Sequence, residues 1–244
     1  MRSFHVSNYE VFNPKFEYME ESTKYRRFNH FDPNIVTRMY LSHSEINNYI
    51  HEMAASIRKI NPKISVDVIN EGWSIEKRQI KSITIKYREK SNNPVIFIDA
   101  GIHAREWHSN SMGLFLINKL ADEAAADTSG IIFHTTFVIV PNVNPDGYEF
   151  SRKGDKMWRK TRKRITSECI GVDGNRNYDI RWSEGTAELN PCSQVYKGDK
   201  PFSEPETKII KNIMLRYKES CQMYISIHTY GNSILYPWVS DFRN

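Results

Sequence analysis

Apolar residues recur at helical spacing in three stretches of the chain. The 3.6-residue period predicts helices over residues 42–61, 106–125 and 205–217. Ser42 stands at the start of the first helix and Glu45 follows three residues later, as in a capping box that satisfies the free N–H groups of a helix start. Pro205 is expected to open the third helix, because proline is favoured in the first helical turn.

Short apolar runs between these helices predict strands. The runs span residues 64–69, 80–87, 95–98, 133–140 and 223–227. The run 95–98 contains no polar residue, which is typical of a central strand that is covered on both faces. Strands that alternate with helices predict an α/β fold with helices covering a sheet.

Residues 1–36 differ from the rest of the chain. They contain eight aromatic residues but show neither a period of 2 nor one of 3.6. We therefore expect an irregular segment over 1–36 and a structured domain over 37–244. No apolar stretch follows Met1, so no signal peptide is visible in this sequence.

The composition supports a packed core. Of the 244 residues, 39% are apolar and 26% are charged, which argues against global disorder. No apolar run approaches the roughly 20 residues of a membrane-spanning helix, so we expect no membrane partner. The net charge of +5 is concentrated in residues 152–164, which hold eight basic residues and one acid. Such a cluster could bind nucleic acid or lie in a solvated loop, and no nucleic-acid-binding motif accompanies it.

Three cysteines leave at least one thiol unpaired. Cys169 and Cys192 border a polar stretch that a disulfide could stabilise, which would indicate an oxidising compartment. Free thiols are the alternative, and three cysteines alone do not decide between the two.

The strongest candidate for chemistry follows the predicted strand 95–98. His103 and Glu106 lie three residues apart in the turn after this strand, and His228 directly follows the strand 223–227. Sites in open α/β sheets form beyond the carboxyl ends of the strands, so all three side chains could reach one cation. Two imidazoles and one carboxylate, with water in the fourth position, form a known catalytic zinc set.

Six motifs occur along the chain in the order of a known family. They are HAREW at 103–107, NPDGY at 144–148, WRKTR at 158–162, GVDGNRNY at 171–178, FSEPE at 202–206 and SIHTY at 226–230. Over residues 36–244 the chain resembles the zinc metallocarboxypeptidases of the carboxypeptidase A/B type, close to secreted members that are formed as proenzymes. The resemblance implies a mixed parallel and antiparallel central sheet with helices on both faces. It also implies hydrolysis that removes C-terminal residues from peptides and proteins.

The resemblance further implies a role for individual residues. One Zn²⁺ ion would be held by His103, Glu106 and His228, with Asp173 orienting the first histidine. Arg162 would polarise the scissile carbonyl and stabilise the oxyanion. The residues expected to contact the substrate are Asn175 and Arg176, which would bind its terminal carboxylate, and Arg105, Arg159 and Tyr230. Cys169 and Cys192 match a disulfide of the family. A secreted monomer that binds peptides with a free C-terminal carboxylate, and no nucleic acid, is implied.

The same resemblance raises an expectation about activity. The family carries its general-base glutamate several tens of residues beyond the third zinc ligand, whereas 16 residues follow His228 here. We therefore expect that the C-terminal strands and helices of the domain are missing, that 1–36 is a pro-segment remnant, and that the chain by itself hydrolyses little. A non-catalytic module that binds zinc or peptide C-termini is the alternative function. The preferred C-terminal side chain is not predicted.

Overall fold

The computed structural model describes residues 31–90, 92–126, 130–182 and 188–237. Its helices and strands, with η for 3₁₀-helices, are η1 (Pro33–Thr37), α1 (His43–Ile60), β1 (Ile64–Trp73), β2 (Gln79–Tyr87), β3 (Val95–Ala100), α2 (Trp107–Ala126), η2 (Ile131–Phe133), β4 (Thr136–Val140), α3 (Pro145–Lys153), η3 (Gly174–Arg176), α4 (Pro205–Arg216) and β5 (Cys221–Ile227). Most of the expected irregular segment, residues 1–30, lies outside the described residues. The expected boundary at residue 36 falls within η1.

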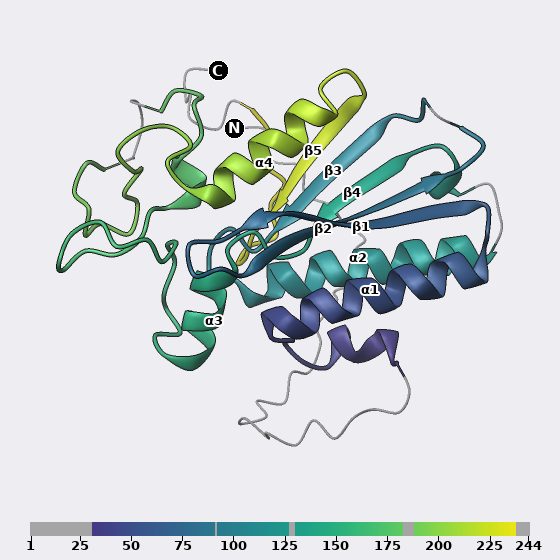
Figure 1. The fold of residues 1–244 in the computed structure, drawn as a ribbon, viewed down its shortest axis with the longest axis horizontal. Helices are drawn as coiled ribbons and strands as arrows, with labels where there is room; N and C mark the ends of the chain where they lie inside the picture. Colours follow the sequence, from purple (N-terminus) through teal and green to yellow (C-terminus); the bar gives the residue numbers. More distant parts are fainter. Residues whose placement is uncertain (1–30, 91, 127–129, 183–187, 238–244) are drawn as a thin grey trace.

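The five strands form one mixed sheet in the order β1-β2-β4-β3-β5 (Figure 1). The pairs β1/β2 and β2/β4 are antiparallel, whereas β3 pairs in parallel with both β4 and β5. The expectation of a mixed sheet is confirmed. The apolar run 95–98 lies in β3, which has a hydrogen-bonded neighbour on each side.

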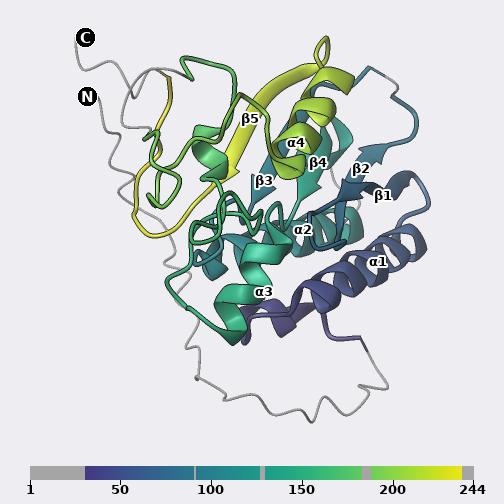
Figure 2. The ribbon, with the colours of Figure 1, turned by 60° about the vertical axis from the view of Figure 1, so that its left-hand side comes forward.

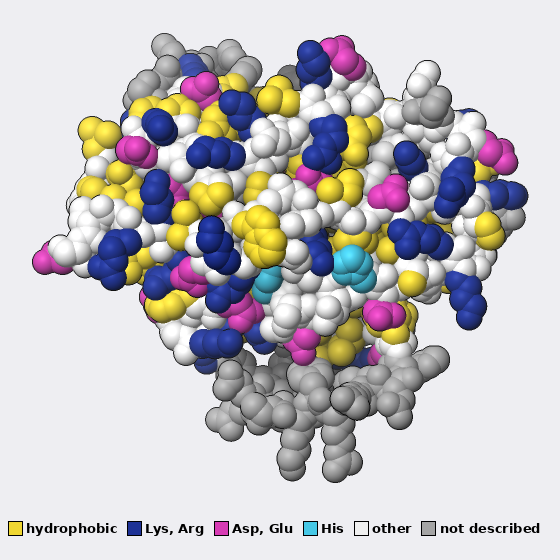
Figure 3. Space-filling model, in the orientation of Figure 1, with side chains coloured by type: hydrophobic (Ala, Val, Ile, Leu, Met, Phe, Trp, Pro, Cys, Tyr) yellow, Lys and Arg dark blue, Asp and Glu magenta, His cyan; other side chains and the backbone are white. Residues whose placement is uncertain are grey.

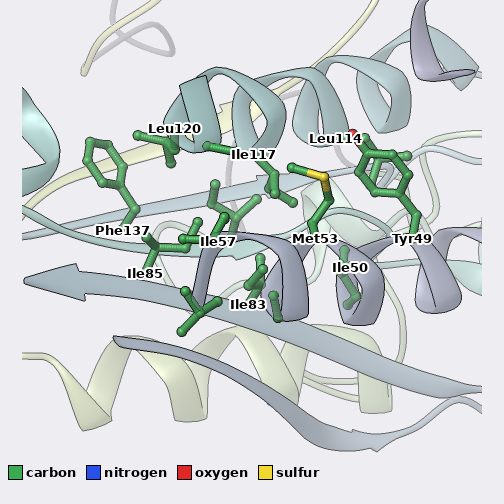
Figure 4. Packing of buried hydrophobic residues seen from close by; sticks show 14 of the residues in the cluster. Tyr49, Ile50, Met53, Ile57, Ile83, Ile85, Leu114, Ile117, Leu120 and Phe137 are labelled. Atoms are coloured by element: carbon green, nitrogen blue, oxygen red, sulfur yellow. The ribbon is translucent and has the colours of Figure 1, made fainter. Parts of the chain in front are cut away.

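Helices cover both faces of the sheet, as expected. Figures 1 and 2 show α1 and α2 against one face and α4 against the other. The two faces carry separate cores: Ile57, Ile83 and Ile117 belong to the first, and Phe97 and Ile210 belong to the second. Figure 4 shows the first core, in which side chains of α1 and α2 meet those of β2 and β4. The sheet contributes side chains to both cores, so the burial of apolar surface on each face holds the helices against it.

The predicted capping box is present at the start of α1. The Ser42 side chain accepts from the Glu45 N–H, and the Glu45 carboxylate accepts from the Ser42 N–H. Pro205 opens α4 as expected. The sequence reasoning missed α3, which Asn144 caps by accepting from the Gly147 N–H at 3.0 Å. This helix has nine residues and few apolar ones, so its period is too weak to detect.

Two strand boundaries differ from the prediction. Residues 131–133 form η2, so β4 begins at Thr136 rather than at Phe133. β1 continues past the predicted end at Ile69 to Trp73, because its pairing with β2 resumes after an irregularity between Asn70 and Gly72. None of the helices in the described part of the chain has the length and apolar content to cross a bilayer.

A buried carboxyl group lies in the first turn of α4. Glu206 is 1% exposed, and neither of its carboxyl oxygens accepts a hydrogen bond from another described residue. Burial raises the pKa of Glu206 to about 8, and the nearby charges of Glu204 and Asp146 act in the same direction. The group is therefore protonated in the folded protein over most of the neutral range.

We expect Glu206→Gln to stabilise the protein at alkaline pH. The unfolded chain loses the proton of this carboxyl near pH 4.5, and the folded protein keeps it to about pH 8. The free energy of unfolding therefore falls as the pH rises between these values, by roughly 3 kcal/mol from pH 5 to pH 8. The glutamine variant lacks this fall, so it should match the parent at pH 5 and exceed it at pH 8.

The measurement is urea unfolding at both pH values, with exposed Glu219→Gln as the control. The expectation would be contradicted if the difference in free energy of unfolding between the parent and Glu206→Gln were the same at pH 5 and at pH 8.

Candidate metal centre

The parallel pairing of β3 with β5 brings the two histidines of the predicted site together. Ala100 at the end of β3 lies opposite Ile227 at the end of β5. Both strands therefore end at the same edge of the sheet, where His103 follows β3 and His228 follows β5. The loops between α3 and α4 gather beside this edge (Figure 1).

A tight turn carries the chain from β3 to His103. Gly101 has φ +73°, and a side chain there would place its Cβ 2.1 Å from the Asn110 amide nitrogen. Only glycine meets both conditions without strain. The turn then places Glu106 directly before α2, on the same side as His103.

The ligand atoms of the predicted trio converge. His103 Nδ1 lies 2.7 Å from Glu106 Oε1, and His228 Nδ1 lies 3.0 Å from Glu106 Oε2 and 3.1 Å from His103 Nδ1. The Thr229 N–H also donates to Glu106 Oε2 at 3.1 Å. Within the described part of the chain, these three residues are the group of histidine and acidic side chains that could hold a metal ion.

Asp173 holds the first histidine from behind. Its carboxylate, fully buried, lies 3.1 Å from His103 Nε2 and accepts two hydrogen bonds from Arg159 on the other oxygen, at 2.9 and 3.1 Å. Because an ionised carboxylate can only accept, the proton of His103 belongs on Nε2 and Nδ1 is free to bind a cation.

The charges within the site shift its pKa values. Burial alone lowers the pKa of His103, but the hydrogen bonds and negative charges of Asp173 and Glu106 outweigh burial and raise it. Burial alone raises the pKa of Glu106, whereas the bonds from both histidines lower it to about 2. Glu106 is therefore ionised at neutral pH. Two carboxylates around the imidazoles make the centre attractive to a cation.

Asn177 organises the loop that carries Asp173, and the sequence reasoning did not identify it. This fully buried amide donates to Lys197 O, Lys200 O and Ser203 Oγ, and it accepts from Glu204 N–H and Thr207 Oγ1. A polar residue in a loop carries no sequence signal of burial. Its role depends on segments about 20 to 30 residues away, which only the fold brings together.

The two arginines of the WRKTR motif lie in different places. Arg159 contacts Asp173, and its Nη1 is 3.9 Å from Glu106 Oε1. The Arg162 guanidinium stacks over the Phe150 ring at 3.6 Å, with Glu76 as its ion-pair partner at 3.9 Å. Among the described contacts, none joins Arg162 to the trio. The structure thus brings Arg159 to the centre and directs Arg162 elsewhere.

The other predicted substrate contacts surround the centre less closely. Asn175 and Arg176 lie in η3, which begins directly after Asp173, and Asn175 is exposed. Arg105 follows His103 and donates to Met157 O at 3.3 Å. The Tyr230 side chain is wholly exposed, two residues beyond His228.

Most of the basic residues between 152 and 164 have partners within the chain. Arg152 and Lys153 pair with Glu149, and Lys163 pairs with Glu204. On the face drawn in Figure 3, basic side chains are likewise spaced among neutral and acidic ones. Part of the cluster's charge is therefore paired within α3, and part links the following loop to the start of α4.

The predicted disulfide is present. Cys169 and Cys192 are bonded, with their Cα atoms 4.7 Å apart, and the thiol of Cys221 is free. The bond closes the polar loop that follows the basic cluster.

Comparison with known proteins identifies the family. The sequence profile described as zinc carboxypeptidase matches residues 14–243. The chain belongs to the zinc carboxypeptidase family. Members of this family are hydrolases that use one Zn²⁺ ion, and carboxypeptidases act on peptides.

The relatives of this zinc carboxypeptidase chain include proteins named carboxypeptidase A and proteins named carboxypeptidase B. It is 38% identical over 180 residues to carboxypeptidase B of Helicoverpa zea, covering 71% of this chain and 42% of the relative. It is 34% identical over 201 residues to carboxypeptidase B of Astacus astacus, covering 82% and 64%. The solved carboxypeptidase A of Helicoverpa armigera superposes with a TM-score of 0.71 at 30% identity, covering 80% of this chain and 48% of that one. The chain thus spans about half the length of the relatives it matches.

The trio suits zinc by its chemistry as well as by its family. Imidazole nitrogens and a carboxylate are common zinc ligands, and tetrahedral ligands at Zn–N distances of about 2.0–2.1 Å lie roughly 3.3 Å apart. The two Nδ1 atoms, 3.1 Å apart, are close to that spacing.

We expect Asp173→Asn to weaken zinc binding about 10-fold, because partners behind a histidine ligand set its orientation and basicity. The measurement is the zinc Kd, obtained by competition with a chromophoric chelator. Exposed Asp199→Asn serves as the matched control. Equal zinc affinities for Asp173→Asn and the parent would show that Asp173 does not support the histidine.

Proposed function

We propose that this chain is the part of a zinc carboxypeptidase that binds the metal and the C-terminal carboxylate of a peptide. The observation that carries the proposal is the convergence of His103, Glu106 and His228, with η3 beginning directly after Asp173. In this proposal the trio holds one zinc ion. Bound there, zinc would polarise the scissile carbonyl and activate a water molecule.

Asn175 and Arg176 would bind the C-terminal carboxylate of the substrate. A guanidinium can bind a carboxylate through two parallel hydrogen bonds, which a lysine cannot do. A free C-terminus is the feature that distinguishes the substrate of an exopeptidase. Arg105 and Tyr230 each follow a proposed histidine ligand by two residues. They would contact substrate residues on the N-terminal side of the scissile bond.

We assign the polarising arginine to Arg159 rather than to Arg162. Both side chains are equally buried, but only the Arg159 guanidinium lies near the trio, 3.9 Å from Glu106. A preorganised cation beside a developing oxyanion stabilises the transition state. Arg162 instead packs on Phe150 and Trp158, where it supports the segment that carries Arg159.

The general base of the reaction would come from outside the described residues. Among these, Glu106 is the one glutamate in contact with either histidine, and as a proposed ligand it cannot also be the base. The resemblance places the base beyond the third ligand, and the chain spans about half the length of the relatives it matches. We therefore propose that the 244-residue chain by itself binds zinc and peptide C-termini but hydrolyses peptides only slowly.

The location and oligomeric state of the protein belong to the same proposal. The Cys169–Cys192 disulfide supports an oxidising, extracellular location, because such bonds persist there and are rare in the cytosol. We propose that the protein works as a monomer on peptides and proteins.

The function is tested by assaying this chain beside a C-terminally extended form on a blocked dipeptide with a free C-terminus. We expect hydrolysis by the extended form, its loss with a chelator and its recovery with zinc. The amidated dipeptide is the control and should not be cleaved. A general base contributes about 10²–10⁴-fold, so the 244-residue chain should be slower by at least that range. Comparable turnover by both forms would overturn the account of the base.

The arginine assignment has its own test in the extended form. We expect Arg159→Ala to lower kcat by about 10²–10³-fold, the usual cost of one oxyanion-stabilising donor, with a smaller change in KM. Arg162→Ala, the matched variant from the same motif, should change kcat by less than Arg159→Ala does. The reverse order would return Arg162 to the role that the family resemblance implied.

A further inference from the structure

A buried acid, Asp99, is linked to the second histidine of the centre through a serine hydroxyl. Asp99 in β3 is fully buried and lies opposite Ser226 of β5 in the parallel pairing. Ser226 Oγ donates to Asp99 Oδ1 at 2.8 Å and lies 3.3 Å from His228 Nε2. An acid within an apolar strand is costly to bury unless it is hydrogen-bonded. The contact with Ser226 provides such a bond and also connects Asp99 to His228.

The hydrogen bonds favour one direction when Oδ1 of Asp99 carries no proton. The Ser226 hydroxyl has a single proton, and it is used on Asp99. Its oxygen can therefore only accept from His228, which places the imidazole proton on Nε2. A neutral imidazole has one N–H, so His228 Nδ1, the atom that faces Glu106, is left with a free lone pair.

This direction holds whether Asp99 is ionised or carries its proton on Oδ2. Burial raises the pKa of Asp99, and the hydroxyls of Tyr224 and Ser226 that bond to it act in the opposite direction. If the carboxyl holds a proton on Oδ2, the Tyr224 hydroxyl can accept it, since a phenol both donates and accepts. Oδ1 still accepts from Ser226 in either state.

The alternative arrangement is unfavourable. If Ser226 donated to His228, the imidazole proton would move to Nδ1 and occupy the lone pair that a metal needs. Asp99 Oδ1 would also lose its donor in a site without exposure to solvent, which costs about 1–3 kcal/mol for an unsatisfied buried group.

We propose that Asp99 and Ser226 form a positioning pair that holds His228 in the tautomer required to bind zinc through Nδ1. The inference rests on the proposed function, because it takes the trio as the zinc site. Asp173 does the same directly for His103, so each histidine has its own buried carboxylate: one in direct contact, the other acting through a hydroxyl.

The test compares Ser226→Val with Ser226→Thr, which match in shape and differ in the hydroxyl. Loss of a partner behind a histidine ligand usually costs 10–100-fold in metal affinity. We expect Ser226→Val to raise the zinc Kd at least about 10-fold and Ser226→Thr to stay close to the parent. The readouts are the zinc Kd by chelator competition and the melting temperature of the zinc-free chain. Ser65→Val, a half-buried strand serine of β1, is the matched control.

A double-mutant cycle with Asp99→Leu tests whether the two residues act in series. We expect Asp99→Leu to weaken zinc binding, and Asp99→Leu with Ser226→Val to be no weaker than Asp99→Leu alone. Two purely structural defects would instead add. If Asp99→Leu does not fold, the Val and Thr variants decide by themselves.

The outcomes separate this inference from the proposed function. Equal zinc affinities for the Val and Thr variants, or costs that add in full, would overturn the positioning pair and leave the zinc site standing. A parent chain that binds no more zinc than His228→Ala would overturn both.

Discussion

The candidate site depends on one interaction, the parallel pairing of β3 with β5. Its register sets Asp99 against Ser226 and Ala100 against Ile227, so the chain leaves both strands at the same height. His103 and His228 are 125 residues apart, and no local contact could bring them within 3.1 Å. The backbone ladder does so, and the apolar layers on both faces hold the ladder in place.

A second constraint is the set of buried polar contacts that holds the loops between α3 and α4. These loops have little apolar core of their own, yet Asp173, Asn177 and Glu204 are fully buried among them. Thr161 Oγ1 donates to the Glu204 carboxylate and accepts from Val172 N–H, so α4 is linked to the segments that carry Arg159 and Asp173. Because unsatisfied buried polar groups are costly, such a network favours a single arrangement of the loops.

The regular elements were largely predictable, and the exceptions have physical causes. The capping box of Ser42 and the apolar period of α1 are local signals that the structure confirms. α3 was missed because the helix is short and has few apolar residues. β1 was predicted too short because Asn70, Glu71 and Gly72 end the apolar run, although Asn70, Gly72 and Trp73 still pair with β2. Pairing and burial override local preference where a neighbouring strand supplies the hydrogen bonds.

The sequence by itself determined which residue types could serve the site, because a metal and a carboxylate each require particular donors. It placed His103 and Glu106 in the turn after one predicted strand and His228 directly after another, and it contained the motifs of the family. Tertiary structure decided which of two arginines in one motif reaches the centre, since the backbone directs Arg159 to Asp173 and Arg162 to Phe150. It also decided that Asp99 lies behind a histidine. Both outcomes depend on where side chains point after distant segments pack, which spacing along the chain does not specify.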